Sequence, residues 1–211
     1  MSAASPRRPA LKPRKSPGQS RSAETVRTIL EGAARVLEER GLDGYTTNAV
    51  AERAGVSIGS VYQYFPGKDA LTAALVARET ALLIEAVRAA PSAATPEDGF
   101  RRIVQACVAH QMARPRLALL LDREESRLQL ADTLGSVAGD LTTALLALLA
   151  LLALLGAGLP AEPETAAGDL FALVRGMVDA AGERGERDGE ALERRVLRAV
   201  HGYLGLPQAV A

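Results

Sequence analysis

Apolar residues recur at intervals of three and four along almost the whole chain, the spacing that places them on one face of an α-helix. Aromatic residues make up only 3% of the sequence, while alanine and leucine are abundant, and this composition favours helices over sheet. No segment shows the alternation of a half-buried strand. The 211 residues are therefore expected to form an all-α protein of about nine helices.

Glycine, proline and capping residues predict where these helices begin and end. In the first part of the chain, the expected helices cover residues 22–41, 46–54, 57–65 and 68–90. After a linker of sequence PSAATP, the expected helices cover residues 100–114 and 116–125, a long stretch ending at 155, and residues 164–181 and 190–204.

The N-terminal segment is basic and rich in proline. Residues 1–22 hold six lysines and arginines and no acid, so the rest of this neutral chain carries six net negative charges. Four prolines prevent a stable helix there. Residues 1–21 are expected to be a disordered arm, either attracted to nucleic-acid phosphate or merely solubilising.

Residues 141–159 contain no charge and are long enough to cross a bilayer. Seven of them are alanine or glycine, two are threonine, and no lysine, arginine or aromatic belt flanks them. A helix that is apolar all round can also be buried inside a helical domain. We favour the buried helix and expect no membrane partner, with a membrane-associated helical protein as the alternative.

Residues 46–68 have the spacing of a helix-turn-helix, two short helices joined by a turn at Gly55. In the second helix, an advance of roughly 100° per residue from Ile58 points Val61 and Phe65 toward the core, with Ile58 beside them. The two tyrosines, Tyr62 and Tyr64, then lie on the flanks. The opposite face carries Gly59, Ser60 and Gln63.

This face suits a DNA major groove. Gly59 permits close backbone approach, Ser60 can bond to base edges and Gln63 can pair with adenine. The flanking tyrosine hydroxyls can bind phosphates, which fixes register without reading sequence. Lys68 opens the next helix, whose N-terminus favours an anion, and Thr47 can add a phosphate contact. Each residue alone is equally well explained by packing or solvation, so the DNA interpretation depends on the whole set.

Residues 22–78 resemble the DNA-binding head of the TetR family of bacterial regulators. The matching strings are YTT at 45–47, AERAGVS at 51–57 and VYQYFPGKDAL at 61–71. The resemblance implies a DNA-binding domain over residues 22–68 and a helical ligand-binding and dimerisation domain over 69–211. It also implies phosphate contacts from Thr47, Tyr62, Tyr64 and Lys68, and a base-facing set of Ser57, Ile58, Gly59, Ser60 and Gln63. The family often has histidine where this chain has Tyr64.

The implied function is a transcriptional regulator, expected to be a repressor. It would bind a palindromic operator as a homodimer and be released by a small ligand. The resemblance places dimerisation in residues 164–181 and 190–204. Their apolar stripes fit a four-helix dimer interface, or else pack into the chain's own core.

The resemblance further implies a ligand pocket in the body, where apolar residues favour a mostly apolar effector. For every candidate, ordinary core packing is the competing explanation. The candidate lining residues are Phe100, Cys107, Gln111, Met112, Phe171, Arg175 and Met177.

Other classes of function find little support. No nucleophile elbow or phosphate loop is present, so we expect no enzyme. His110 and His201 fall on separate helices without other ligands at metal-binding spacing, so we expect neither a metal nor a cofactor. The single cysteine and the lack of a secretory signal fit the cytoplasm, with nucleoid association when bound to DNA. A ligand-binding protein without operator specificity is the remaining alternative.

Overall fold

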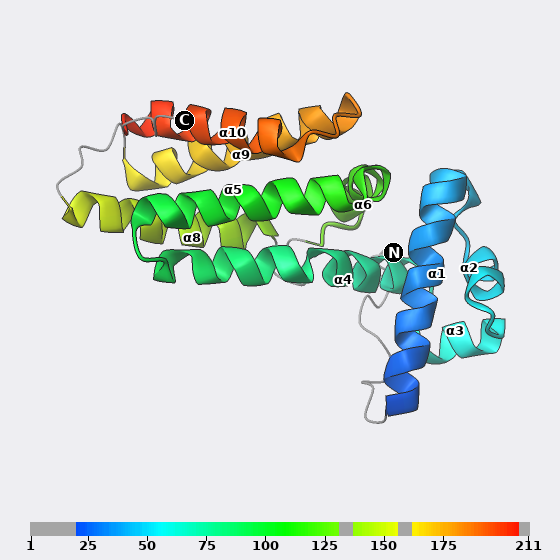
Figure 1. Ribbon diagram of the computed structural model, residues 1–211. Helices are drawn as coiled ribbons and strands as arrows, with labels where there is room; N and C mark the ends of the chain where they lie inside the picture. Colours follow the sequence, from blue (N-terminus) through cyan, green and yellow to red (C-terminus); the bar gives the residue numbers. More distant parts are fainter. Residues whose placement is uncertain (1–19, 131–136, 156–161, 207–211) are drawn as a thin grey trace, which may run out of the picture. The chain divides into compact units, whose positions relative to one another are not determined.

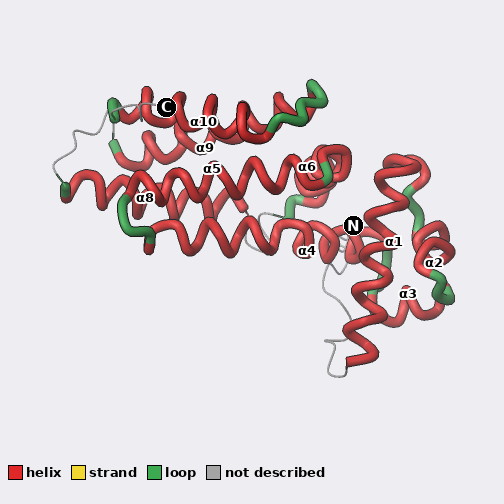
Figure 2. Tube along the Cα trace, in the orientation of Figure 1, coloured by secondary structure: helices red, strands yellow, loops and turns green. Residues whose placement is uncertain are grey.

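The computed structural model describes residues 20–130, 137–155 and 162–206. Within these ranges the backbone forms nine α-helices, a short 3-10 helix η1 (Ala90–Ser92) and no strand (Figure 2), which confirms the all-α expectation. The helices are α1 (Ser20–Gly44), α2 (Thr47–Ala54), α3 (Ile58–Tyr64), α4 (Lys68–Ala89), α5 (Pro96–Ala113), α6 (Pro115–Leu128), α8 (Val137–Leu154), α9 (Pro163–Glu183) and α10 (Gly189–Leu204).

The expected caps of the short helices are present. The Thr46 side chain accepts a hydrogen bond from the Ala49 N–H at the start of α2, and the Ser57 side chain accepts one from the Ser60 N–H at the start of α3. Gly55 ends α2 with φ 67°, a left-handed conformation that glycine adopts without strain. Gly41, expected to end α1, instead kinks it at φ 65°, and the helix continues to Gly44.

The chain divides into two compact units. The first comprises residues 1–78 and 120–128, and the second comprises residues 79–119 and 129–211. The boundary expected after residue 68 coincides with the start of α4, but the first unit continues along this helix to Arg78 and also takes the end of α6. Buried Leu71 and Leu75 explain the extension, because the first turns of α4 belong to the core of the first unit.

The core of the first unit forms where α1, α2 and α3 pack together (Figure 1). Helix α1 approaches α2 so closely that a Cβ added at Gly32 would lie 2.9 Å from the Cβ of Ala54. The arrangement holds α3 against the remainder of this unit through its apolar face. The fully buried side chains include Ile29, Leu37, Val50, Val61, Phe65 and Leu71.

The second unit is a bundle in which α5 contacts α8, α9 and α10, and α9 and α10 run side by side (Figure 1). Phe100 and Leu148 lie in its core, and a Cβ at Gly99 would collide with the Leu148 side chain. Helices α5 and α8 therefore approach more closely than a larger residue at position 99 would allow.

The apolar stripes of α9 and α10 are buried within the protomer. Leu170, Val174 and Val178 of α9 lie in the same core cluster as Leu192, Val196 and Val200 of α10. These six residues pack into the chain's own core, whereas Phe171, Met177 and Tyr203 of the same stripes are only partly buried against it. A dimer through these helices has to use their partly buried and exposed residues.

Helix α8 accounts for most of the uncharged segment. One face is buried in the core through Leu141, Leu145, Leu148 and Leu152, whereas Leu154 near its end is exposed. No helix in the described ranges is long and apolar enough to cross a bilayer. Residues 156–159, and the basic arm before residue 20, lie outside the described part of the chain.

Candidate nucleic-acid interface

Helix α3 buries one face and exposes the other, as its periodicity predicted. Val61 and Phe65 are buried, while Gly59 and Gln63 are exposed and Ser60 is half-buried. Ile58, expected beside the core residues, is 37% exposed. Ile58 is the first residue of α3, and its side chain points outward, which suits the base-facing role that the resemblance implies.

Thr47 and Tyr62 meet at the edge of this face. The Oγ1 atom of Thr47 lies 3.3 Å from the phenol oxygen of Tyr62, joining the start of α2 to α3. Tyr62 is 44% exposed and Thr47 is partly exposed, so both hydroxyls can reach a ligand from neighbouring positions. Two adjacent hydroxyl groups can each donate a hydrogen bond to the oxygens of one phosphate group.

The start of α3 is ordered by its serines. Ser57 Oγ lies 2.9 Å from Ser60 Oγ and accepts from the Ser60 N–H at 3.0 Å. Between them, a Cβ at Gly59 would meet only Ser57 Oγ, at 3.7 Å. Nothing among the described residues therefore requires glycine at position 59, whereas close approach of a base or backbone to α3 would.

Tyr64 differs from its expected position on the flank. Its side chain is only 8% exposed and belongs to the core of the first unit. Its bulk has turned inward because it lies next to Phe65 at the C-terminal end of α3, where the helix meets the core. The phosphate contact of Tyr64 stays a prediction, and it would have to come from the hydroxyl because the ring is buried.

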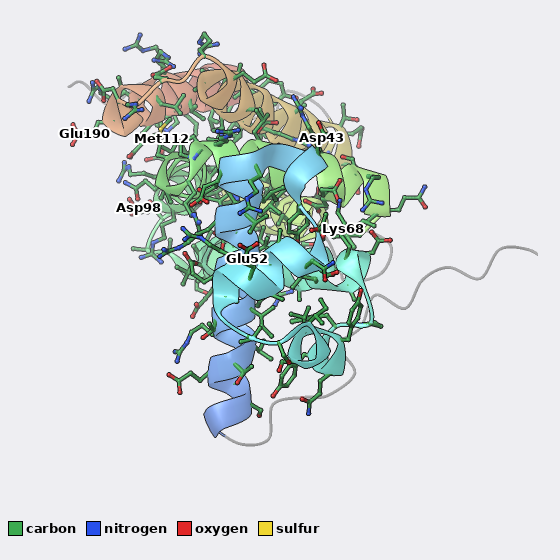
Figure 3. The ribbon with its side chains drawn as sticks, turned by 90° about the vertical axis from the view of Figure 1, so that its right-hand side faces the viewer. Asp43, Glu52, Lys68, Asp98, Met112 and Glu190 are labelled. Carbon is green, nitrogen blue, oxygen red and sulfur yellow. The ribbon has the colours of Figure 1, made fainter. Side chains whose placement is uncertain are left out.

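Lys68 lies at the start of α4, where Figure 3 labels it, with its Nζ 5.2 Å from the centre of the Tyr45 ring. Burial raises the pKa of the Tyr45 phenol to about 12, so the ring stays neutral beneath the ammonium group. Thr72 Oγ1 lies 3.3 Å from the Tyr45 hydroxyl and 2.9 Å from the Lys68 carbonyl oxygen. Tyr45 thus supports Lys68, a role that sequence reasoning missed because Tyr45 lies outside the two helices of the motif.

A second feature is an ion-pair cluster on α6, whose contact with α4 the sequence does not indicate. Arg127 contacts Glu124 on its own helix and Asp69 in the first turn of α4. No local sequence signal connects positions separated by 58 residues. Only the fold brings Arg127 beside the residue that follows Lys68.

The residues proposed to line a pocket belong to the second unit. Phe100 and Gln111 are buried, and Gln111 packs so tightly against Gly182 that a Cβ there would overlap it. Arg175 is exposed, pairs with Asp179 and lies 6.0 Å from the Phe171 ring. The remaining three, Cys107, Met112 and Met177, are partly buried against the core.

Cys107 carries no sign of reactivity, because burial raises the pKa of its thiol to about 12. Among the described residues, no three histidine, cysteine, aspartate or glutamate side chains gather as a metal site would require.

A capped helix-turn-helix with an exposed second helix, flanked by hydroxyls and a lysine, defines a DNA-binding protein of the helix-turn-helix class. Residues 29–75 match the model of bacterial regulatory proteins of the tetR family, and residues 95–204 match that of the tetracyclin repressor-like C-terminal domain. The chain therefore belongs to the TetR family of transcriptional regulators.

Curated relatives resemble part of the chain. The transcriptional repressor AcnR of Corynebacterium diphtheriae is 31% identical over 94 residues, 44% of this chain and 45% of AcnR. The repressor KstR of Mycobacterium tuberculosis is 31% identical over 87 residues, 41% of this chain and 38% of KstR. The match thus spans less than half the length of these relatives.

Solved structures resemble nearly the whole fold. The regulator FadR of Bacillus subtilis, in complex with stearoyl-CoA, superposes with a TM-score of 0.72 at 20% sequence identity. The superposition covers 84% of this chain and 98% of FadR. At this identity the likeness establishes the fold alone.

Proposed function

We propose that this protein is a transcriptional repressor that binds a palindromic operator as a homodimer and is released by a small effector. The observation that carries the proposal is the outer face of α3. Gly59 and Gln63 are exposed on it, the Thr47–Tyr62 hydroxyl contact joins it to α2, and Lys68 begins the next helix, α4. This is the distribution of a recognition helix, with base-facing residues in the centre and phosphate contacts on the rim.

The homodimer is supported by small residues on the outer faces of the last two helices. Gly168, Ala172 and Gly176 follow one another at intervals of four on α9 and are exposed. A Cβ at Gly168, at Gly176 or at Gly202 of α10 would meet no atom of the described residues within 4 Å. Glycine inside a helix costs roughly 0.5–1 kcal/mol relative to alanine, and close approach of a partner helix is our explanation for that cost.

The effector is proposed to be mostly apolar. The buried residues of α5 and α8 are aliphatic and aromatic, with Gln111 as the buried polar side chain of α5. The FadR structure of the same fold holds stearoyl-CoA, a ligand with a long apolar chain. The effector must bind the DNA-incompetent state more tightly, since equal binding shifts no equilibrium. The protein would act in the cytoplasm and has no proposed catalytic role.

The test begins with selection from a randomised DNA pool, using protein unfolded and refolded to remove bound ligand. Recovery of an inverted repeat, with a log–log salt slope steeper than about −4, supports the proposal. Tyr62→Phe and Lys68→Ala should weaken binding, while Arg102→Ala, which removes an exposed charge from α5 of the second unit, should not. Failure to enrich any sequence overturns the proposal.

A further inference from the structure

Glu124 is a buried carboxylate in the first unit, with 4% of its surface exposed. Removing a carboxylate from water is costly unless a cation and hydrogen bonds compensate. Arg127, one turn later on α6, compensates it in bidentate fashion. Its Nε donates to Glu124 Oε1 at 2.9 Å and its Nη2 donates to Oε2 at 2.8 Å.

The same guanidinium reaches a second helix. Arg127 Nη2 also donates to Asp69 Oδ1 at 2.7 Å, so one arginine serves two carboxylates. These hydrogen bonds hold the pKa of the guanidinium above its usual range, first through Glu124 and then through Asp69. Arg127 therefore joins the end of α6 to the first turn of α4 as a permanent charge.

The first turn of α4 is where Lys68 lies. Both carboxylates are close enough to the Tyr45 ring beneath Lys68 that their negative charge adds to the rise in its pKa, after the larger effect of burial. Without a neutralising cation, Asp69 would present a negative charge beside the lysine that is proposed to bind phosphate. A phosphate bound by Lys68 would then approach a second negative charge, and two charges of the same sign repel even in water.

Stability alone does not account for the cluster. Ion pairs that are buried on one side are often no more stabilising than apolar residues of the same size. The guanidinium is also about half exposed, with a relative side-chain accessibility of 48%, so solvent screens it. An arginine that spans two carboxylates does fix geometry and charge together.

We propose that Arg127 is a positioning residue for DNA binding, which cancels the charge of Asp69 so that Lys68 can bind phosphate. The inference rests on the proposed function. It predicts that the effect of losing Arg127 depends on whether the acid at position 69 is present. A purely structural role of the Arg127–Asp69 contact also couples the two positions, but it predicts that Asp69→Asn weakens binding and does not rescue Arg127→Gln.

The experiment measures the affinity of purified full-length variants for the selected duplex by fluorescence anisotropy, with melting curves on the same samples. Arg127→Gln should raise Kd at least about fivefold through repulsion at two half-sites. Arg127→Lys keeps the charge but loses the bidentate geometry, so it should raise Kd less than Arg127→Gln does. The control Arg123→Gln removes an exposed charge from the same helix and should also stay within about twofold.

The decisive variant combines Arg127→Gln with Asp69→Asn, which should restore binding to within about twofold of wild type. Asp69→Asn alone leaves the Arg127–Glu124 pair intact and should tighten binding. The inference is overturned if Arg127→Gln matches the Arg123→Gln control, if the double variant stays weak, or if Asp69→Asn alone weakens binding. Absence of binding by wild-type protein would refute the proposed function instead.

Discussion

Gly32 on α1 and Ala54 on α2 approach so closely that a Cβ added to Gly32 would lie 2.9 Å from the Ala54 Cβ and 3.1 Å from the Ala54 backbone nitrogen. The neighbouring atoms include backbone, which cannot yield as a flexible side chain can. Gly32→Ala should therefore push α2 away from α1 and lower the free energy of unfolding by about 1–3 kcal/mol. Chemical denaturation measures this loss.

A matched control for this substitution lies in the same unit. Gly59 is also helical, but its added Cβ would meet only Ser57 Oγ at 3.7 Å. Gly59→Ala should leave the free energy of unfolding unchanged or raise it by about 0.5 kcal/mol. Equal destabilisation by the two substitutions would contradict the close approach of α1 and α2.

Gly59→Ala should weaken DNA binding even though it leaves the stability of the fold intact. If α3 enters the major groove, its exposed glycine meets the DNA, and a methyl group there would cost about 1–3 kcal/mol through overpacking. We expect an operator Kd at least about fivefold higher, with the melting temperature retained. Unchanged affinity would mean that another face of α3 reads the DNA.

The Thr47–Tyr62 contact predicts coupling in DNA binding. Tyr62→Phe should cost about 0.5–1.5 kcal/mol for each lost hydroxyl contact. If both hydroxyls hold one phosphate, Thr47→Val and Tyr62→Phe should be non-additive by at least about 0.5 kcal/mol in a double-mutant cycle. Thr28→Val removes the exposed hydroxyl that bonds to the Glu24 carbonyl and should add independently with Tyr62→Phe.

The local order of the head was predictable because its signals are local. Thr46, Ser57 and Gly55 act on the few residues beside them, and the helical period of α3 placed Val61 and Phe65 in the core. The orientation of Tyr64 was not predictable from period alone. It depends on where the C-terminal end of α3 meets the core.

Contacts between distant segments carry no such local signal. The apolar stripes of α9 and α10 were equally compatible with a dimer seam and with an internal core, and Leu170 and Val196 are buried internally. The contact of Arg127 with Asp69 likewise became visible only in the fold. Periodicity identifies a buried face, but only three-dimensional packing identifies what buries it.

The exposed small residues of α9 predict the oligomeric state of a variant. Gly176→Leu places a bulky side chain in open space in the protomer, so the monomer should remain folded. If a partner helix lies there, the dimer dissociation constant should rise at least about tenfold through overpacking. Sedimentation equilibrium measures it, with Ala109→Leu on an exposed position of α5 as the control. Equal dimerisation of both variants would place the interface elsewhere.

His110 on α5 predicts how stability depends on pH. Burial lowers the pKa of its imidazole below the ordinary 6.5, and this effect outweighs the charge and the backbone hydrogen bond of Glu79, which raise the pKa. The Glu79 carboxylate also lies 3.9 Å from the guanidinium of Arg114. The unfolded chain therefore takes up a proton at higher pH than the folded chain. Stability from His110 is complete above pH 6.5 and is lost as the pH falls through the lowered folded value.

Wild-type protein should accordingly lose melting temperature between about pH 7 and pH 5, the interval that brackets the free imidazole. His110→Gln should show a shallower decline, because glutamine does not titrate. His201→Gln, which removes the other histidine of the chain, tests whether the effect belongs to this position. If the two variants decline in parallel with wild type, carboxylates elsewhere in the fold govern the acid limb of stability.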